Sequence, residues 1–441
     1  MSAPARPDPR KTLMDTTSPV LVDDLRASTQ RRTLIVVVTS QILGGAGLAA
    51  GVTVGALLTK EMLGSSRYAG LSSALFTLGS AAAALLVGRV SHRLGRRTGL
   101  SIGYLAGAAG GAGVVLAAVM DSLPLLFVSM FVYGSGTATN LQARYAGTDL
   151  AEASHRGRAV STIMVATTFG AVAGPNLVEV MGDLADGWGI PVLAGPFILS
   201  SAAFAAAGMF LLAFLRPDPL RVARQLQSEP VVAGGEVPPE PDRDTQRRGI
   251  LVGATVMVVT QIVMVAIMTM TPIHMMDHGH GLGQTGMVIA IHVAAMFLPS
   301  PLTGMLADRY GRIPVVVAAG VTLLAAGILA ALAPADSVVL LSVALGLLGL
   351  GWNFGLISGT AILTDSTPLA TRARTQGSVD LCIALASAGG GIVSGMVVAS
   401  SSFAVLSLGG GLIALALIPV LALNRRQAQA APEPARAGTT S

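Results

Sequence analysis

Charged side chains are scarce in this sequence. Asp, Glu, Lys and Arg together make up 12% of its 441 residues, whereas apolar residues supply 52%. An ordinary soluble domain carries about a quarter of its residues as charged side chains. The composition therefore argues against a soluble globular protein and favours one that lies in a membrane.

Cysteine, aromatic residues and catalytic motifs are also scarce or absent. The single cysteine, Cys382, lies inside an apolar run and excludes a disulfide within the chain. Aromatic residues make up 4%, which counts against a pocket built on ring stacking. There is no Gly-x-x-x-x-Gly-Lys-Ser or His-Glu-x-x-His segment, and no spacing typical of a nucleophile with its base. These absences argue against an ATP-driven pump and against a membrane enzyme, and the sequence predicts no cofactor and no metal site.

Long apolar runs are what the chain has instead. They reach the ~20 residues that a helix needs to cross the hydrocarbon core, and they lack the alternation of barrel strands. We therefore predict an all-α integral membrane protein. Twelve spans are expected, at residues 34–58, 68–88, 98–119, 123–146, 159–181, 190–215, 249–272, 285–306, 313–334, 337–362, 376–399 and 403–423.

Polar segments divide these spans into two sets of six. The segment 216–248 is rich in proline and mixed charges, a composition that predicts a flexible linker. The segment 1–33 has the same character, resembles no signal peptide, and is expected to be largely disordered. The expected organisation is a cytoplasmic tail at 1–33, a six-helix bundle at 34–215, a cytoplasmic linker at 216–248, a second bundle at 249–423 and a cytoplasmic tail at 424–441.

The distribution of Lys and Arg predicts the orientation. With the N-terminus inside, all but two of the 28 basic residues lie in inner segments, and only Lys60 and Arg67 lie outside. Because inner loops of membrane proteins are enriched in Lys and Arg, both termini are expected to be cytoplasmic. The net charge of +5 is then explained by topology, so no nucleic-acid partner is inferred.

The stretch 88–97 returns at 304–312, half the chain further on, which indicates a duplication. We call the separation between positions 88 and 304 the duplication offset. Further polar residues repeat at the same offset after the fourth and tenth spans, whereas Gln41 and Gln261, in the first and seventh spans, correspond at a slightly larger one. The matching pairs are Gly88 with Gly304, Arg93 with Arg309, Gly95 with Gly311, Arg96 with Arg312, Asp149 with Asp365, Arg156 with Arg372, and Arg158 with Arg374.

On these residues the chain resembles the major facilitator superfamily, over about residues 34–423. The signature of that family is Gly-x-x-x-Asp-Arg-x-Gly-Arg between the second and third spans. Residues 304–312 match it fully, whereas 88–97 carry His92 where aspartate is usual. The resemblance implies two six-helix bundles, a small-molecule substrate, contact with lipid and a monomeric carrier. It also implies a cytoplasmic gate formed by the residues of the matching pairs above together with Asp308; for some of the arginines, a role in topology alone is the alternative.

The fifth span contains Gly170, Gly174 and Pro175, which resemble the antiporter motif of drug-exporting members of the family. Glycines four residues apart allow close helix contact, and proline bends the helix. Two features depart from the family pattern. Asn176 follows the proline where a glycine pair is usual, and Met130 stands where exporters often have a proton-coupling arginine.

Three ionisable residues stand out inside the expected spans, where a charge costs roughly 3 kcal/mol. In the functional interpretation, Asp380 and His292 bind the coupling proton and Arg144 is the counter-charge. In the alternative, Asp380 pairs structurally with Arg144, Arg372 or Arg374, and His292 makes one interhelical hydrogen bond.

Uncharged amides inside the spans are candidates for the substrate cavity. They are Gln41 and Gln261, related by the duplication, with Asn140 and Asn353 as weaker candidates. The methionines that gather between 257 and 305 suit either a promiscuous pocket or a plain core. The loop 274–280 has three histidines, but their spacing fits no standard metal site.

These features predict a proton-coupled secondary carrier that exports a small apolar or amphipathic compound. Uptake of a polar metabolite, or a membrane sensor that no longer transports, are the alternatives.

Overall fold

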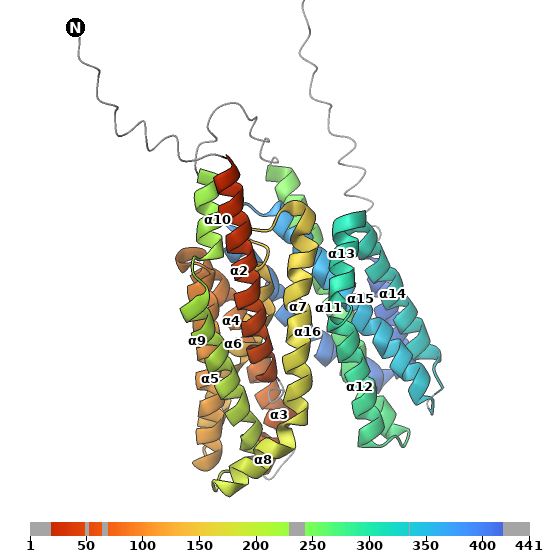
Figure 1. Ribbon diagram of the computed structural model, residues 1–441. Helices are drawn as coiled ribbons and strands as arrows, with labels where there is room; N and C mark the ends of the chain where they lie inside the picture. The colour runs from red at the N-terminus through yellow and green to blue at the C-terminus, as the bar shows by residue number, and fades with distance from the viewer. Residues whose placement is uncertain (1–18, 49–52, 64–68, 229–242, 335, 418–441) are drawn as a thin grey trace, which may run out of the picture.

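The computed structural model describes residues 19–48, 53–63, 69–228, 243–334 and 336–417. All regular secondary structure in this part of the chain is helical (Figure 1). Eight of the described helices are long and apolar enough to cross a membrane. The predicted fold class, an all-α membrane protein of two six-helix bundles, is confirmed.

The first half contains α2 to α9 and is followed by the short helix α10. Its elements are α2 (Pro19–Ala46), α3 (Thr53–Leu63), α4 (Ala69–Leu94), α5 (Arg96–Val119), α6 (Leu123–Ala146), η2 (Ala153–His155), α7 (Arg156–Asn176), α8 (Val178–Gly187), η3 (Val192–Ala194), α9 (Gly195–Phe214) and α10 (Pro219–Ser228).

The second half contains α11 to α17. Its elements are α11 (Arg243–Asp277), α12 (Leu282–Phe297), α13 (Ser300–Tyr310), α14 (Arg312–Leu332), α15 (Val338–Ser366), α16 (Arg372–Ser400) and α17 (Phe403–Leu415).

Each half has its own apolar core. In the first, the rings of Tyr133, Phe197 and Phe204 pack together, with centroids 5.3 and 5.6 Å from that of Tyr133. In the second, Leu323, Leu348 and other aliphatic side chains are fully buried between α11, α14 and α15. The second core also includes Tyr145, Val160 and Met164 of the first half, so apolar packing continues across the boundary between the bundles.

Three elements differ from the sequence-based expectation. Helix α2 begins at Pro19, although the segment 1–33 was expected to be largely disordered. The eighth span is broken into α12 and α13 around Pro299. The segment 219–228 of the expected flexible linker forms α10, because Val222, Ala223 and Leu226 make an apolar stripe at helical spacing that the average composition conceals.

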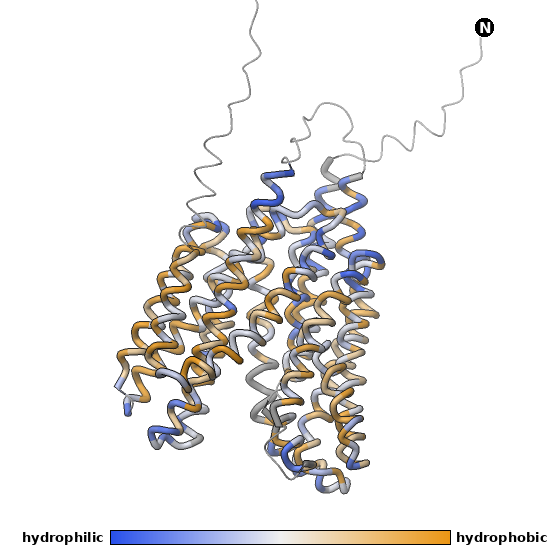
Figure 2. The backbone as a smooth tube through the Cα atoms, turned by 180° about the vertical axis from the view of Figure 1, so that it is seen from behind, coloured by the Kyte–Doolittle hydropathy of each residue, from blue (hydrophilic) through white to orange (hydrophobic). Residues whose placement is uncertain are grey.

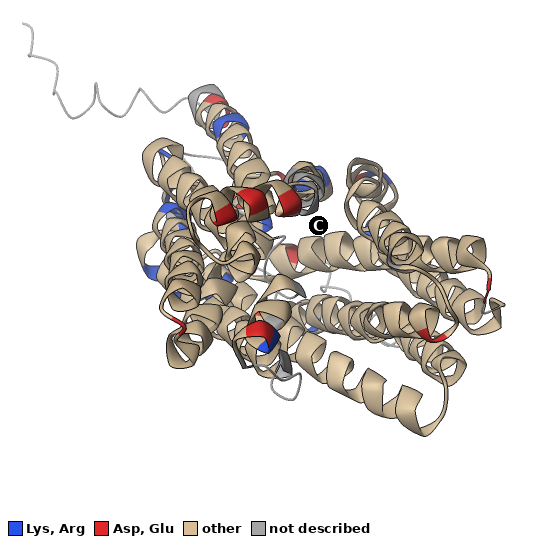
Figure 3. Ribbon diagram, turned by 90° about the horizontal axis from the view of Figure 1, so that it is seen from below, with Lys and Arg blue, Asp and Glu red and all other residues tan. Residues whose placement is uncertain are grey.

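The two bundles meet through α4 with α16 and through α7 with α13. These contacts lie near the end that carries the turns at residue 95 and residue 311, which we name the basic end. Figure 2 shows hydrophilic segments at this end, an apolar middle, and two bundles that diverge toward the other end. From that other end, acidic residues are seen at the tips of several helices (Figure 3).

Candidate functional site

The two signature turns have the same backbone geometry. Gly95 ends the turn between α4 and α5, and Gly311 ends the turn between α13 and α14; both have φ of 92°. This conformation strains any residue with a Cβ, so glycine is required at both positions. The first arginine of the next helix, Arg96 or Arg312, is thereby placed at the basic end.

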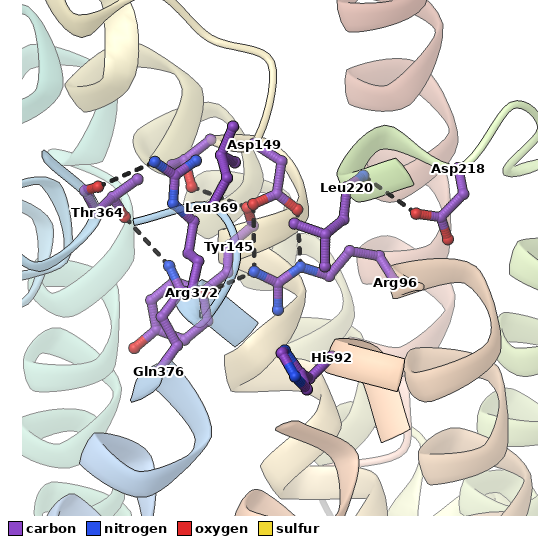
Figure 4. Close-up of polar contacts among 12 residues, drawn as sticks. His92, Arg96, Tyr145, Asp149, Asp218, Leu220, Thr364, Leu369, Arg372 and Gln376 are labelled. Atoms are coloured by element: carbon purple, nitrogen blue, oxygen red, sulfur yellow. Dashed lines mark hydrogen bonds and ion pairs between the residues drawn. The ribbon is translucent and has the colours of Figure 1, made fainter. Parts of the chain in front are cut away.

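Each of these arginines forms an ion pair with the duplicated aspartate of its own half. Arg96 Nε lies 2.8 Å from Asp149 Oδ2, and both side chains are buried. Arg312 Nε lies 3.2 Å from Asp365 Oδ2. Figure 4 shows the first pair between α4, α5 and α16. The duplication offset therefore relates two ion pairs as well as two stretches of sequence.

Further polar contacts join the two halves at the basic end. Arg96 donates to Gln376 of α16, and Arg156 of α7 donates to Asp365. Asp308 accepts hydrogen bonds from the backbone N–H groups of Gly157 and Arg158, each at 2.9 Å. A carboxylate at this point stabilises the N-terminus of α7 by hydrogen bonding and by the helix dipole.

Glycines permit the close approach of the helices that these contacts require. A Cβ on Gly88 of α4 would lie 2.7 Å from the Cα of Gly377 in α16. Gly304 of α13 faces the backbone of Gly157 in α7 in the same way. The structure thus joins α4 to α16 and α13 to α7 by equivalent contacts.

The remaining arginines of the predicted gate have different surroundings. Arg372 is buried and donates to the carbonyl groups of Thr364 and Thr367 at 3.3 Å, within its own half. Arg309 lies over the ring of Tyr310, while Arg93 and Arg374 are exposed. The side chain of Arg158 is exposed as well, and none of these five arginines makes a described ion pair across the two bundles.

A second ion pair joins the bundles deeper in the molecule. Arg144 of α6 donates to Asp380 Oδ1 of α16 at 2.7 Å, with exposed side-chain fractions of 0% and 2%. Tyr145 donates its hydroxyl to the same oxygen at 3.0 Å. Arg144 also donates to the Tyr145 hydroxyl at 2.8 Å and to Thr360 at 3.1 Å. The carboxylate Oδ1 is therefore held by two donors from the opposite bundle.

The other oxygen of this carboxylate is differently placed. Asp380 Oδ2 is buried and has no hydrogen-bond partner among the described residues. Asp380 lines a cavity of about 300 Å³ between the bundles, and among the described lining residues it is the one ionisable side chain. An acceptor in this position is available to a proton or to a donor group of a ligand.

The rest of the cavity lining is largely apolar, with a few amides and hydroxyls. Gln261 receives a hydrogen bond from Trp352 Nε1 and donates to Ser387, each at 2.7 Å, so its amide is fixed. Asn140 also lines the cavity. The apolar wall includes aromatic rings and flexible thioethers, from Phe76, Phe297, Trp352, Met164, Met264 and Met296.

Two of the predicted amides have other surroundings. Gln41 is fully buried, donates to Thr167 at 3.0 Å and accepts from Tyr104 at 2.6 Å. Asn353 binds the carbonyl of Met296 and the hydroxyl of Ser300 at the break between α12 and α13. Neither is among the described lining residues of the cavity.

His292 is fully buried in α12 and is not brought to Asp380 by any described contact. Its Nδ1 donates to the carbonyl of Leu345 at 2.9 Å, and its Nε2 has no partner among the described residues. The interhelical hydrogen bond of the alternative interpretation is therefore present.

Other sequence features have no described part in the site. Gly170, Gly174 and Pro175 lie in α7, but in a segment whose side chains are outside the described residues. Met130 is buried in the first core. The described part of the chain contains no group of three or more His, Cys, Asp and Glu side chains that could hold a metal ion.

Sequence reasoning missed Tyr145 and Trp352 as site residues. A tyrosine beside a buried arginine at a span end was the available signal for the first. Trp352 gave no signal of its own, because its role depends on facing Gln261 from another helix.

The chain is similar to known proteins over most of its length. The family model described as Major Facilitator Superfamily matches residues 37–281 and 253–441. The uncharacterized MFS-type transporter YdeG of Bacillus subtilis is 60% identical over 399 residues, which cover 90% of this chain and 93% of that protein.

A more distant relative and a solved structure also match most of the chain. The riboflavin transporter RfnT of Brucella anthropi is 30% identical over 400 residues, covering 90% of this chain and 96% of that protein. The structure of the proton:xylose symporter XylE superposes with a TM-score of 0.68 at 17% identity, over 90% of this chain and 96% of that chain. At this identity the superposition shows the fold alone.

Proposed function

The chain belongs to the Major Facilitator Superfamily and is a multi-pass membrane transporter rather than an enzyme, and we propose that it exports a small apolar or amphipathic compound in exchange for protons. The basic end faces the cytoplasm in this proposal, and both termini lie there, as the distribution of basic residues predicts. The protein sits in the cytoplasmic membrane and acts by alternating access, with the two bundles rocking around the central cavity.

The observation that carries the proposal is the Arg144–Asp380 pair between the bundles. Removing the charge of one partner in a buried pair costs roughly 3–5 kcal/mol, because the other charge is left uncompensated. Protonation of Asp380 does this chemically, since a neutral carboxyl group no longer balances Arg144. A proton that reaches Oδ2 from the cavity therefore weakens the contact between the halves.

The gate at the basic end responds through the same helices. Asp380 and Gln376 lie one turn apart on α16, and Gln376 accepts from Arg96 of the gate. A movement of α16 that follows loss of the Arg144 contact also changes the Arg96 contact. We also propose that His292 is a second proton-binding residue in this cycle.

The cavity lining supports the class of compound. With Asp380 balanced by Arg144, the described lining is close to neutral and mostly apolar. Such a site favours compounds with apolar rings and few charges over anions, with Gln261 and Asn140 supplying hydrogen bonds. The relative named a riboflavin transporter makes riboflavin a first compound to test, because it joins a planar ring system to a polar chain.

The test is proton movement in proteoliposomes with an imposed pH gradient, with wild type compared to Asp380→Asn. Riboflavin, lipophilic cationic dyes and small metabolites are added in turn. We expect a transported compound to dissipate the gradient with wild type, and Asp380→Asn to abolish this dissipation. The matched control is Asp121→Asn, because Asp121 is exposed in the turn after α5 and its φ of 49° is also tolerated by asparagine.

Each outcome decides a different part of the proposal. Equal proton movement in wild type and Asp380→Asn contradicts the coupling role of Asp380. Substrate flux without proton movement in either protein contradicts proton exchange but leaves a carrier. Transport of the compound toward the cytoplasmic side favours the alternative, uptake of a metabolite. The absence of any flux favours a membrane sensor with the same fold.

A further inference from the structure

The two halves differ at one position of their otherwise equivalent gate contacts. In the second bundle, Asp308 caps α7 by accepting from the N–H groups of Gly157 and Arg158. The duplication offset places His92 at the corresponding point of α4, next to the N-terminus of α16. An imidazole cannot accept from two adjacent N–H groups as a carboxylate does. The first signature turn therefore lacks the group that holds its counterpart.

An arginine from helix α10 occupies this place. Arg224 Nη1 donates to the carbonyl of His92 at 2.9 Å, and Nη2 donates to His92 Nδ1 at 3.2 Å. The same guanidinium donates to the carbonyl groups of Leu369 and Ala370 at 3.3 Å. His92 belongs to the first bundle, whereas Leu369 and Ala370 form the turn that leads into α16 of the second. Figure 4 shows His92 and Leu369 near the Arg96–Asp149 pair.

Helix α10 is fixed to the first bundle by independent contacts. Asp218 precedes the helix and accepts from the N–H of Arg97, at the start of α5, at 2.8 Å. It also accepts from the N–H groups of Leu220 and Arg221 and so caps α10 itself. Val222 and Ala223 are buried against Leu150 in one apolar cluster, which Leu226 and Leu369 complete. These contacts aim the Arg224 side chain at the boundary between the bundles.

We propose that Arg224 is a positioning residue of the closed basic end, where it holds the turn before α16 against α4 in place of the missing carboxylate. The segment between the two bundles is then part of the gate as well as a connection. His92 contributes its carbonyl and its Nδ1 lone pair as acceptors for the guanidinium. When the basic end opens, α16 moves away from α4, and the bonds of Arg224 to residues 369 and 370 are lost.

Spin labels across the basic end test this directly. Leu94 and Tyr310 end α4 and α13, are 47% and 61% exposed, and correspond at the duplication offset. Both are changed to cysteine in a Cys382→Ser background and labelled in nanodiscs without substrate. The population of short and long distances then reports how often the basic end is closed.

The expected result is a shift from short to long distances in Arg224→Ala. We expect the ratio of open to closed populations to rise about tenfold, the change that loss of one charge-assisted hydrogen bond produces. Arg224→Lys should give an intermediate shift, because an ammonium group cannot reach four acceptors at once. The matched control is Arg221→Ala on the same helix, since Arg221 is exposed and the N–H that it donates to Asp218 is retained.

A rescue separates positioning from general stability. His92→Asp supplies the carboxylate that the second half has at Asp308, so the double variant Arg224→Ala with His92→Asp should recover the short distance. Thermal unfolding is measured in parallel on all variants. The proposal is overturned if Arg224→Ala leaves the distances unchanged, or if it shifts them no more than Arg221→Ala does. Because no substrate is used, this result is independent of the export proposal.

Discussion

At the scale of single residues, Tyr145 connects two charged sites. The guanidinium carbon of Arg144 lies 4.2 Å from the centroid of the Tyr145 ring, and the guanidinium carbon of Arg96 lies 5.7 Å from the same centroid. The Tyr145 hydroxyl binds Asp380 Oδ1. Arginine over an aromatic face is attractive, and more so when water is excluded. Tyr145 thus lies between the buried pair and the gate pair, although it carries no charge itself.

Tyr145→Phe should therefore reduce coupled transport while keeping the fold. Phenylalanine retains the ring beneath both arginines but loses the hydroxyl that donates to Asp380. Hydrogen bonds to charged groups are worth roughly 1.5–3 kcal/mol, so we expect flux in the proteoliposome assay to fall at least about tenfold. Tyr310→Phe is the control, because Tyr310 is 61% exposed at the end of α13. Unchanged flux in Tyr145→Phe would remove the hydroxyl from the mechanism.

At the scale of elements, the closed end depends on helices that lack side chains where they cross. Gly88 against Gly377, and Gly304 against Gly157, bring α4 to α16 and α13 to α7 at backbone distance. Such small residues are what allow helices to approach closely in membranes. The break between α12 and α13 is stabilised by Asn353, which binds the carbonyl of Met296.

Gly88→Ala should hold the basic end open. The added Cβ would lie 2.7 Å from the Cα of Gly377, so α4 and α16 must separate. The control is Gly286→Ala in α12, where an added Cβ meets nothing within 4 Å. Both changes gain the same roughly 0.5–1 kcal/mol of helix propensity, so a difference between them reports the crossing. The Leu94 and Tyr310 label pair should lengthen in Gly88→Ala only; equal distances in both variants would contradict the close contact.

At the scale of the whole molecule, the interface between the bundles combines contacts of unequal strength. The Arg144–Asp380 pair is buried, whereas Arg156 and Asp365 keep exposed side-chain fractions of 15% and 31%. Exposed pairs contribute roughly 0.2–1 kcal/mol, because water screens them. The deep pair is therefore suited to control the transition, and the outer pair to adjust its balance.

Arg156→Glu should shift this balance modestly. Two acids then face each other across the bundles, and we expect the open population to rise about two- to fivefold in the spin-label measurement. Adding Asp365→Arg should restore only part of the closed population, because Asp365 also pairs with Arg312. Arg247→Glu, exposed at the start of α11 and at the same end, is the control. A shift of tenfold or more would contradict the small contribution expected of this exposed pair.

The sequence alone determined the features that the two halves of the chain share. Apolar runs require helices in lipid, and the duplication offset related Gly95 to Gly311 and the Arg96–Asp149 pair to Arg312–Asp365. These features follow from local constraints, such as a turn that only glycine allows, and so they are legible without coordinates. The family, the fold class and the residues that line the basic end were predictable for this reason.

Only the tertiary structure decided the features in which the two halves differ. The duplication places Thr360 at the position of Arg144 and Met164 at that of Asp380, so no internal pattern could pair those two charges. Likewise, Gln41 and Gln261 correspond in sequence, yet only Gln261 lines the cavity. Arg224 was concealed in a segment whose composition indicated a flexible linker. Each of these depends on which side chains face one another across two bundles, a long-range relation that local sequence does not encode.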